Sequence, residues 1–549
     1  MQPILKIFVP VLASIVAYYL FRTIRWGLSR IPSPLSLPGP PNPGWFFGHQ
    51  KEIWSKSTPL GEPTLMDEWH EMYGPTFKAG GFFGGYRIYS MDIKVVQHIM
   101  RNDDIYLKPP VMRNLLNMIL GEGTGVIVAE GAQHRLQRKA MNPAFGPSQI
   151  REFTKTFFHK SIEMRDIWKA QIANEGVGEI DPVEWLSKVT VDIIGLTGFN
   201  YHLNALNDGQ TNALNEAFKT MFHSSGWDSP WMPLIAALPK SIQSIIKTLA
   251  LACGVDTAMK SSVDCIQRSC RQLLMENKAQ LVATGEKDIG SGSRNLLSLL
   301  LKSNMSPDTP AHARMSDADV MAQIPTFLIA GHDTTSLATN WALLELSLHQ
   351  DIQAKLQEEL LSVPTATPSM DELNGLPLLD GFVRETLRLH SPITTLGRIA
   401  VQDDIIPLAH PFTDSDGTVH DKLPVRKGQL IHLTLHQVNT DKSLWGPHAD
   451  RFRPDRWLNL PDSARTIPGA YSNTLSFWGG SHGCMGWRFT SIEMKVLIFV
   501  LLRSFHFELA VQKDELMVLK MASIWQRPSL KSEPLQTRLP LVVKLLKNE

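Results

Sequence analysis

The chain has 549 residues, of which 43% are hydrophobic and 19% are charged, so it can bury a large core and is neither disordered nor coiled coil throughout. Its 54 Lys and Arg against 53 Asp and Glu give a formal net charge of +1, which provides no reason to expect nucleic acid as a partner. Length divided by roughly 150 would allow about three or four domains. The 4 cysteines are too few for a disulfide framework, and none forms a CxxC pair.

Residues 1–22 are predicted to form a membrane anchor. The apolar run from Ile7 to Phe21 approaches the roughly 20 residues that span a bilayer. A cleaved secretory signal and a peripheral hydrophobic tail are the competing interpretations, and no small-residue cleavage site follows the run. Arg22, Arg25 and Arg30 come after it, so the rest of the chain is expected to face the cytosol.

Residues 23–45 are predicted to be a hinge that is first basic and then proline-rich. Its six prolines between positions 31 and 44 exclude a helix or a central strand, so the segment is expected to be a stiff, extended spacer. Residues 46–549 contain no internal repeat and no second low-complexity linker, and they are predicted to form a single catalytic domain.

Helical periodicity dominates this domain, and the strand-like segments are short. The expected fold class is therefore mainly α with small β-sheets (α+β). The expected helices are 149–172, 183–196, 316–350, 379–389 and 491–504, and the expected strands are 85–89, 429–435 and 539–545.

A basic segment at 131–139, which contains His134 and Arg138, would by itself be interpreted as a solvated helix. Further along, the sequence Glu385-Thr-Leu-Arg388 places two opposite charges on one helical face. Such a pair is by itself a common surface ion pair worth a few tenths of a kcal/mol. Neither motif indicates a function alone.

The helix expected at 316–350 carries an unusual polar turn, Ala330-Gly-His-Asp-Thr-Thr335, among apolar residues. It begins at Ser316-x-x-Asp319, which resembles a capping box. A buried acid and buried hydroxyls are costly unless they are hydrogen-bonded. Threonine hydroxyls can bond back to the preceding turn and Pro325 removes a donor, so an opened turn that admits a ligand and water is expected.

The isolated cysteine, Cys484, lies in the glycine-rich stretch Phe477-Trp-Gly-Gly480-Ser-His482-Gly-Cys-Met-Gly486, and a helix is expected to follow. Exposed N–H groups and the positive end of a helix dipole favour a thiolate and lower its pKa. Glycines allow backbone N–H groups to approach the sulfur. One thiolate is too few ligands for structural zinc, whereas one protein ligand with a large cofactor suits haem.

This segment resembles the haem-thiolate signature of the cytochrome P-450 superfamily, Phe-x-x-Gly-x-Arg-x-Cys-x-Gly. The departure is His482 in place of the usual arginine. The other motifs match the family in the same chain order, and the anchor and hinge resemble its microsomal eukaryotic branch, with a general look of the fungal enzymes. In the family the residue at position 134 is typically tryptophan, so His134 is a second departure.

The resemblance implies roles for these residues. Asp333 and Thr334 are the expected catalytic pair, with Asp333 relaying protons and Thr334 hydrogen-bonding dioxygen. Glu385, Arg388 and Arg456 are expected to form a structural triad that holds the cysteine loop. The residues expected to bind the cofactor, haem b, are Cys484 (the axial iron ligand), Phe477, Gly480, His482, Gly486, His134, Arg138, Arg398, Ala330 and Gly331.

The implied reaction inserts one oxygen atom from O2 into a lipophilic small molecule, with a terpenoid or another secondary metabolite favoured. No flavin or nicotinamide motif is convincing, so electrons are expected from NADPH-cytochrome P-450 reductase, with cytochrome b5 as a second candidate donor. The expected location is the endoplasmic reticulum membrane, with the catalytic domain in the cytosol. A haem-thiolate isomerase or dehydratase that acts without O2, and a non-catalytic haem sensor, are the alternatives.

Overall fold

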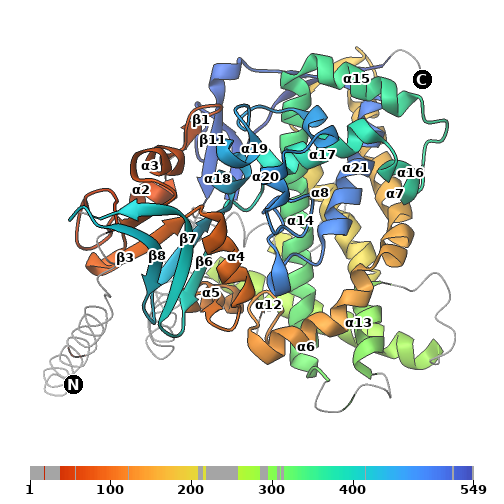
Figure 1. Ribbon diagram of the computed structural model, residues 1–549. Helices are drawn as coiled ribbons and strands as arrows, with labels where there is room; N and C mark the ends of the chain where they lie inside the picture. The colour runs from red at the N-terminus through yellow and green to blue at the C-terminus, as the bar shows by residue number, and fades with distance from the viewer. Residues whose placement is uncertain are drawn as a thin grey trace, which may run out of the picture. The chain divides into compact units, whose positions relative to one another are not determined.

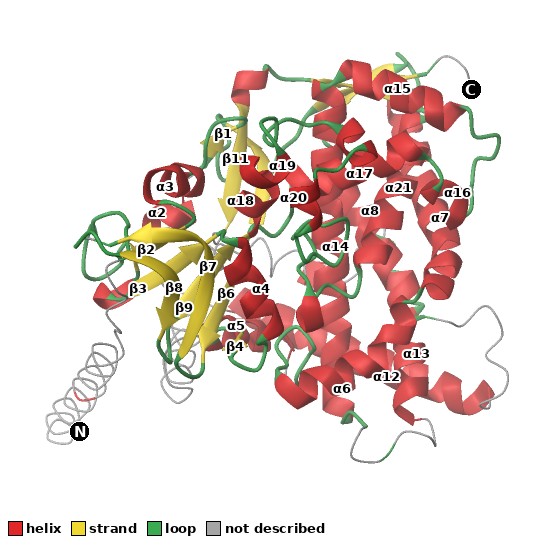
Figure 2. Cartoon of the chain, viewed as in Figure 1, coloured by secondary structure: helices red, strands yellow, loops and turns green. Residues whose placement is uncertain are grey.

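The computed structural model describes Tyr18 and residues 37–55, 57–120, 123–207, 214, 216–217, 257–284, 295–305, 310, 314–414, 416–521 and 525–546 (Figure 1). The predicted anchor, apart from Tyr18, and hinge residues 23–36 lie outside this part of the chain. Within it, none of the helices is both long enough and apolar enough to cross a membrane. Helix predominates and the strands gather into small sheets, which confirms the predicted fold class (Figure 2).

The chain divides into two compact units, and the first comprises residues 1–56, 63–109 and 395–437. Its five-stranded sheet has the order β2-β3-β9-β6-β4, in which β3 and β9 are parallel and the other pairs are antiparallel. Phe77 and Tyr89 stack within its core, with ring centroids 5.6 Å apart. Its elements are α2 (Gln50–Ser55), α3 (Leu65–Tyr73), β2 (Thr76–Gly80), β3 (Tyr86–Ser90), α4 (Ile93–Arg101), β4 (Tyr106–Leu107), β6 (Thr395–Ala400), the hairpin β7 (Asp404–Thr413) and β8 (Val419–Val425), and β9 (Leu430–Thr434).

The second unit comprises residues 57–62, 110–394 and 438–549 and contains most of the helices. Two small antiparallel sheets, of order β1-β11-β12 and β10-β13-β5, lie within it. Its main helices are α5 (Pro110–Leu120), α6 (Gly131–Met141), α7 (Pro147–Ile172), α8 (Pro182–Phe199), α12 (Thr257–Thr284), α13 (Leu296–Met305), α14 (Asp317–Leu348), α15 (Gln350–Leu361), α16 (Met370–Asn374), α17 (Pro377–Leu389) and α21 (Trp487–Leu502). The strands are β1 (Thr58–Pro59), β5 (Val177–Ile180), β10 (Phe505–Leu509), β11 (Leu516–Met521), β12 (Trp525–Leu530) and β13 (Leu541–Leu545).

Helix α14 runs through the core of the second unit and packs against α8, α17 and α21 (Figure 1). Its apolar residues face several directions, which explains why it is buried on most sides. Trp341 is fully buried in α14, and its indole N–H donates to the Gln526 carbonyl of β12 at 3.2 Å. The helix therefore carries both the core packing and the polar turn at 330–335.

The periodic segments of the sequence all form the expected elements. The predicted helices correspond to α7, α8, α14, α17 and α21, and the predicted strands correspond to β3, β9 and β13, with boundaries that differ by at most four residues. Periodicity located these elements because each buries one consistent face or is buried on all sides.

Two local details of α14 differ from expectation. The Ser316 hydroxyl accepts from the Asp319 amide at 3.1 Å, but the Asp319 carboxylate accepts from the Thr124 amide at 2.9 Å, so the predicted capping box is only half formed. The prediction of an opened turn was also wrong, because α14 is a continuous α-helix through Pro325 and on to Leu348. The Thr334 hydroxyl adds a bond to the Ala330 carbonyl, at 2.7 Å, without breaking the helix.

Candidate active site

Cys484 lies between a 3-10 turn, η5 (Gly480–His482), and the start of α21. Its amide donates to the Phe477 carbonyl at 2.8 Å, and the Gly483 amide donates to the Gly480 carbonyl at 3.1 Å. Gly480 has a φ of 62°, in the left-handed region that favours glycine. These backbone hydrogen bonds hold the loop without using the thiol group. The side chain of Cys484 is exposed.

Opposing effects act on the pKa of the Cys484 thiol. Although the Cys484 side chain is exposed, the protein packed around it raises its pKa, whereas a backbone hydrogen bond from Gly486 and the charge of Arg138 lower it. The approach of a backbone N–H to the sulfur was expected from the sequence, whereas the opposing effect of burial on the pKa was not. Cys484 stands two residues before Gly486, the N-cap of α21, and thus just before a helix, as predicted.

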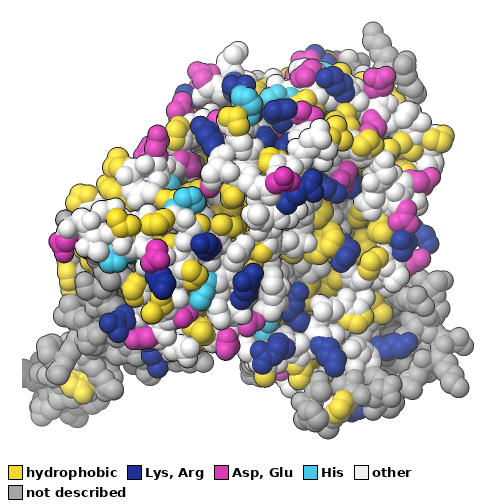
Figure 3. Space-filling model, viewed as in Figure 1, with side chains coloured by type: hydrophobic (Ala, Val, Ile, Leu, Met, Phe, Trp, Pro, Cys, Tyr) yellow, Lys and Arg dark blue, Asp and Glu magenta, His cyan; other side chains and the backbone are white. Residues whose placement is uncertain are grey.

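Helix α6 supplies one flank of this loop. Arg138 donates to the Gly483 carbonyl, next to Cys484. His134 stacks on His482, with ring centroids 3.9 Å apart and an interplanar angle of 17°. Arg135 and Lys139 of α6 are exposed. Figure 3 shows several Lys and Arg side chains over the region that α6 occupies in Figure 1. The structure thus brings His134, Arg138 and His482 together beside Cys484.

The polar turn of α14 interrupts the burial of this continuous helix. Residues 320–328 and 335–347 are almost all buried, whereas residues 329–334 are partly exposed and Ala330 is exposed. A side chain at Gly331 would meet Ile194 of α8 at 2.9 Å, so this glycine allows α8 to pack closely against α14. The turn therefore presents Ala330 and Thr334 on its accessible side.

Asp333 forms an ion pair that the sequence did not indicate. Its carboxylate accepts from Nη2 of Arg527, on β12, at 2.7 Å. Both side chains are less than one-fifth exposed, at 19% for Asp333 and 16% for Arg527. The pairing joins residues 194 positions apart, which explains why no local pattern revealed it. Asp333 is thus held in one orientation beside Thr334.

A second acid missed by sequence reasoning, Glu493, lies in α21. It is fully buried, and burial raises its pKa well above the usual carboxyl range, with only the Thr335 hydroxyl opposing that shift. Thr335 also contacts Thr490 of α21 at 3.2 Å. The sequence signal that could have revealed Glu493 is a single acidic residue among the apolar residues of a predicted helix. Burial therefore favours the neutral form of Glu493, which lies close to Thr335 of α14.

The variant Glu493→Gln is expected to unfold at higher temperature than wild type near pH 8, with the difference shrinking toward pH 5. Folded wild type keeps a proton that the unfolded chain releases above its ordinary carboxyl pKa, so wild type loses about 1.4 kcal/mol of stability per pH unit up to the raised pKa. Thermal unfolding across this range is the measurement. The exposed Glu358→Gln is the control, and a pH-independent difference for Glu493→Gln would contradict the neutral assignment.

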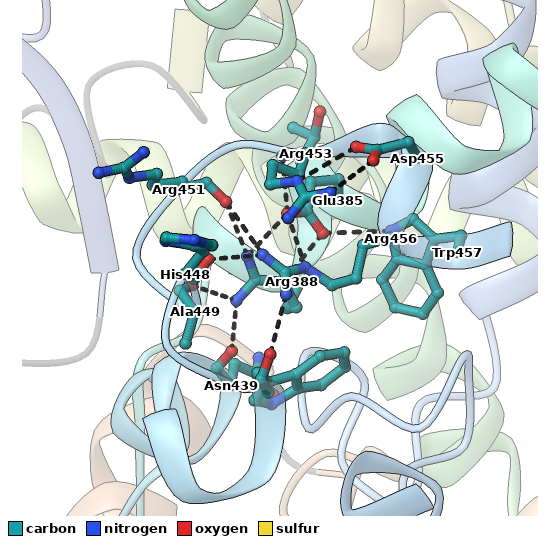
Figure 4. Close-up of polar contacts among 12 residues, drawn as sticks. Glu385, Arg388, Asn439, His448, Ala449, Arg451, Arg453, Asp455, Arg456 and Trp457 are labelled. Carbon is teal, nitrogen blue, oxygen red and sulfur yellow. Dashed lines mark hydrogen bonds and ion pairs between the residues drawn. The ribbon is translucent and has the colours of Figure 1, made fainter. Parts of the chain in front are cut away.

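Glu385, Arg388 and Arg456 meet in a buried network (Figure 4). Arg388 makes two bonds to Glu385, from Nη2 to Oε1 at 2.7 Å and from Nε to Oε2 at 2.9 Å. Arg456 Nε donates to Oε1 at 3.2 Å. The Glu385 carboxylate also accepts from the Arg453 amide at 2.9 Å and the Trp457 indole at 3.2 Å. This carboxylate therefore gathers five donor groups from two parts of the chain.

Asn439 links this network to the cysteine loop. Its carbonyl accepts from Arg388 at 2.7 Å, and its side chain accepts from the Leu475 amide at 2.8 Å and donates to the Ser476 hydroxyl at 3.0 Å. The next residue, Phe477, provides the carbonyl that holds the Cys484 amide. Hydrogen bonds thus run from the triad to Cys484, and Asn439 is a positioning residue that the sequence did not indicate.

Arg398, the remaining predicted cofactor residue, belongs to the other unit and lies on β6. Its Nη1 donates to the Gly397 carbonyl at 2.8 Å, and its strand pairs with β9. Its role in holding a haem carboxylate stays a prediction.

The residues around Cys484 fit a haem group. The set offers an exposed thiol on a fixed backbone, a neighbouring Arg138 whose charge suits a carboxylate, and the apolar ring of Phe477. Across the described residues, no cluster of three or more His, Cys, Asp or Glu could hold a metal ion by itself. A single-thiolate site is therefore suited to a metal that brings its other ligands with it.

Comparison with known proteins shows the class of enzyme. The cytochrome P450 family model matches residues 38–532, so the chain belongs to the cytochrome P450 family. The chain is 43% identical to cytochrome P450 monooxygenase 205 of Postia placenta over 519 residues, covering 93% of both chains, and 42% identical to monooxygenase 128 of the same fungus over 543 residues, covering 97% and 96%. It is 32% identical to a ganoderic acid synthetase of Ganoderma lucidum over 504 residues, covering 88% and 89%. The chain is thus a cytochrome P450 monooxygenase of fungal type, and its cofactor is haem b held by a cysteine thiolate.

Proposed function

We propose that this monooxygenase is anchored in the endoplasmic reticulum membrane by residues 1–22, binds haem through Cys484, and inserts one oxygen atom into a lipophilic terpenoid or another secondary metabolite. The observation that carries the proposal is the exposed Cys484 thiol on a backbone fixed by Phe477. The relative from Ganoderma lucidum, named for the synthesis of ganoderic acid, supports a biosynthetic role.

The haem, when bound, supplies the binding and activation of dioxygen. The surrounding chain provides the thiolate ligand and controls the delivery of protons. The Gly486 N–H and the Arg138 charge favour the thiolate form of Cys484, which is the form that binds metal. Thr334 holds its hydroxyl proton on the Ala330 carbonyl at the accessible side of α14. Asp333 transfers protons from solvent to this hydroxyl once its bond to Arg527 is released.

The overall reaction consumes the substrate, one O2, two electrons and two protons, and it yields the hydroxylated product and one water. NADPH-cytochrome P-450 reductase supplies the electrons, with cytochrome b5 as a second donor. The exposed Arg135 and Lys139 on α6 provide positive charge for an acidic donor protein.

The proposal is tested with full-length protein co-expressed with a reductase in yeast and fed a panel of terpenoids and sterols. We expect an oxygenated product that requires both the reductase and O2, and labelling of that product by heavy-isotope O2. Product that forms without the reductase would instead support an isomerase, and absence of product from every substrate and donor would support a sensor.

The variant Thr334→Ala is expected to consume NADPH while product per NADPH falls by about a hundredfold and hydrogen peroxide rises, because a positioned proton donor is lost. NADPH oxidation, product and peroxide are measured together. Thr326→Ala removes the same type of bond, to the Ala322 carbonyl at 2.7 Å, and should leave the coupling intact. Thr334→Ser should retain most of it, and unchanged coupling in Thr334→Ala would exclude Thr334 from proton transfer.

A further inference from the structure

Arg113, on α5, has no counter-charge in the described part of the chain. Its side chain is partly buried, and its Nε is buried without a hydrogen-bond partner among the described residues. No described carboxylate forms an ion pair with it. By contrast, the Glu385 carboxylate pairs with Arg388, and the Asp333 carboxylate pairs with Arg527. Arg113 is therefore a cation that the described chain does not neutralise.

The helix α5 itself offers no local partner for this charge. Arg113 is the single charged residue of Pro110–Leu120, and most of the other side chains in the helix are apolar. Taking a guanidinium out of water without an opposite charge is costly. Arginine also presents a planar fork of N–H groups that binds a carboxylate through two parallel hydrogen bonds. The position therefore suits an acid that is supplied by a ligand.

Arg113 continues the face of α5 that packs against α14. Arg113, Leu116 and Leu120 are spaced three and then four residues apart, so they share one face of the helix. Leu120 packs with Ala322 of α14, and Leu116 packs against the same cluster. Both helices belong to the second unit. Arg113 thus lies one helical turn beyond the contact that α5 makes with α14.

The chain that follows α5 is fixed on the first turns of α14. The Thr124 amide donates to the Asp319 carboxylate at 2.9 Å, and the Val126 amide donates to the Gln323 side-chain oxygen at 3.0 Å. These bonds hold the end of α5 at the start of α14, and the earlier turns of α5 extend away from that point. The accessible turn at 329–334 follows the same contact region along α14.

We infer that Arg113 binds a carboxylate of the substrate and thereby selects acidic over neutral lipophilic molecules. This inference rests on the proposed oxygenation of a lipophilic molecule and adds a substrate class to it. The apolar body of the acid packs against the apolar side chains of α5, and the guanidinium pairs with the carboxylate. An ion pair at one end of a molecule fixes its orientation, so Arg113 is a specificity-determining residue.

The test compares the binding of carboxylic acids and of their methyl esters to the ferric holoprotein. Lauric, palmitic and abietic acids and their methyl esters are titrated, and the change in the Soret band gives each dissociation constant. At least one acid should bind wild type about fiftyfold more tightly than its ester, because the ester lacks the charge that Arg113 recognises. Failure of every acid to bind, or equal binding of every acid and its ester, would overturn the inference.

The variant Arg113→Met removes the charge and keeps a long apolar side chain. It should weaken binding of the preferred acid by about fiftyfold and change binding of the ester by less than about twofold. Arg113→Lys should retain part of the preference, because lysine keeps the charge without the planar fork. The exposed Arg151→Met is the control and should bind both ligands as wild type does. Equal binding of the acid by wild type and Arg113→Met would contradict the assignment.

Two further measurements distinguish a substrate acid from other partners of Arg113. Ligand-free Arg113→Met should unfold at or above the wild-type temperature and should retain haem as wild type does, because the variant loses only an uncompensated charge. Clear destabilisation or faster haem loss would show that Arg113 serves the fold or a haem carboxylate instead. Acetate at millimolar concentration should not compete with the preferred acid, and competition would show a general anion site.

The reduced, carbon-monoxide-treated spectrum separates this inference from the proposed function. Wild type that shows the red-shifted Soret band but no preference for acids would refute the role of Arg113 alone. Absence of the band from wild type would refute ligation by Cys484. The preference for acids is then measured as ligand-induced thermal stabilisation, which does not depend on the haem spectrum.

Discussion

The variant Cys484→Ala is expected to lose the red-shifted Soret band of the reduced, carbon-monoxide-treated protein and to make product only at the level of a reductase-only control. Alanine removes the ligand but keeps the amide that donates to the Phe477 carbonyl, so the loop should retain its backbone conformation. Absorbance spectra and product yield are the measurements. The loss is expected to be complete because thiolate ligation gives this class of enzyme its oxygen chemistry.

The other described thiols provide the control. Cys270 is buried and burial raises its pKa to about 12, which leaves it an inert thiol, and Cys265 is partly buried on the same helix. Cys265→Ala and Cys270→Ala should therefore keep both the band and the turnover. Retention of the band in Cys484→Ala would show that another group ligates the iron.

The variant Glu385→Ala is expected to destabilise the fold by about 3–5 kcal/mol and to leave little haem-loaded protein. The change leaves Arg388, whose side chain is fully buried, without its counter-charge, and it deprives Arg456 Nε, the Arg453 amide and the Trp457 indole of this acceptor. Removal of one partner from a buried ion pair is costly because the other charge cannot reach water. Denaturant unfolding and haem content are the measurements.

A conservative variant separates charge from hydrogen bonding at this site. Glu385→Gln keeps one acceptor oxygen and should fall between wild type and Glu385→Ala. Asp455→Ala, in the adjacent but exposed Arg453–Asp455 pair, should change stability little because water screens that pair. Wild-type stability in Glu385→Ala would show that the network does not support the cysteine loop.

The five predicted helices could be located because each depends on a short local pattern, whereas helices such as α12, α13 and α15 were not predicted. Segments such as 149–172 and 491–504 show their periodicity within themselves, and the structure places α7 and α21 there. The sheets depend on pairing between distant strands, such as the parallel pair β3 and β9, and a single sequence contains no direct record of that pairing. The hairpin β7–β8 was missed because its exposed and buried residues alternate irregularly.

At the candidate site, too, local features could be predicted and long-range contacts could not. Cys484 and the Glu385–Arg388 motif stand out because their chemistry and spacing are contained in a few residues. Arg527 could not be assigned to Asp333, because nothing near either residue indicates the other. The effect of burial on the pKa of Cys484 also could not be anticipated, since the cost of burying a charge depends on packing that only the folded chain reveals.

The contact between α6 and the cysteine loop has a consequence for biosynthesis. Arg138 and Gly483 are 345 positions apart, whereas Glu385 and Arg456 are only 71 apart. During translation, α6 emerges long before its partner loop exists, while the triad can close soon after its own residues leave the ribosome. A nascent chain stalled before Cys484 therefore has no thiol to ligate haem, so ligation by this residue can begin only after Cys484 has been synthesised.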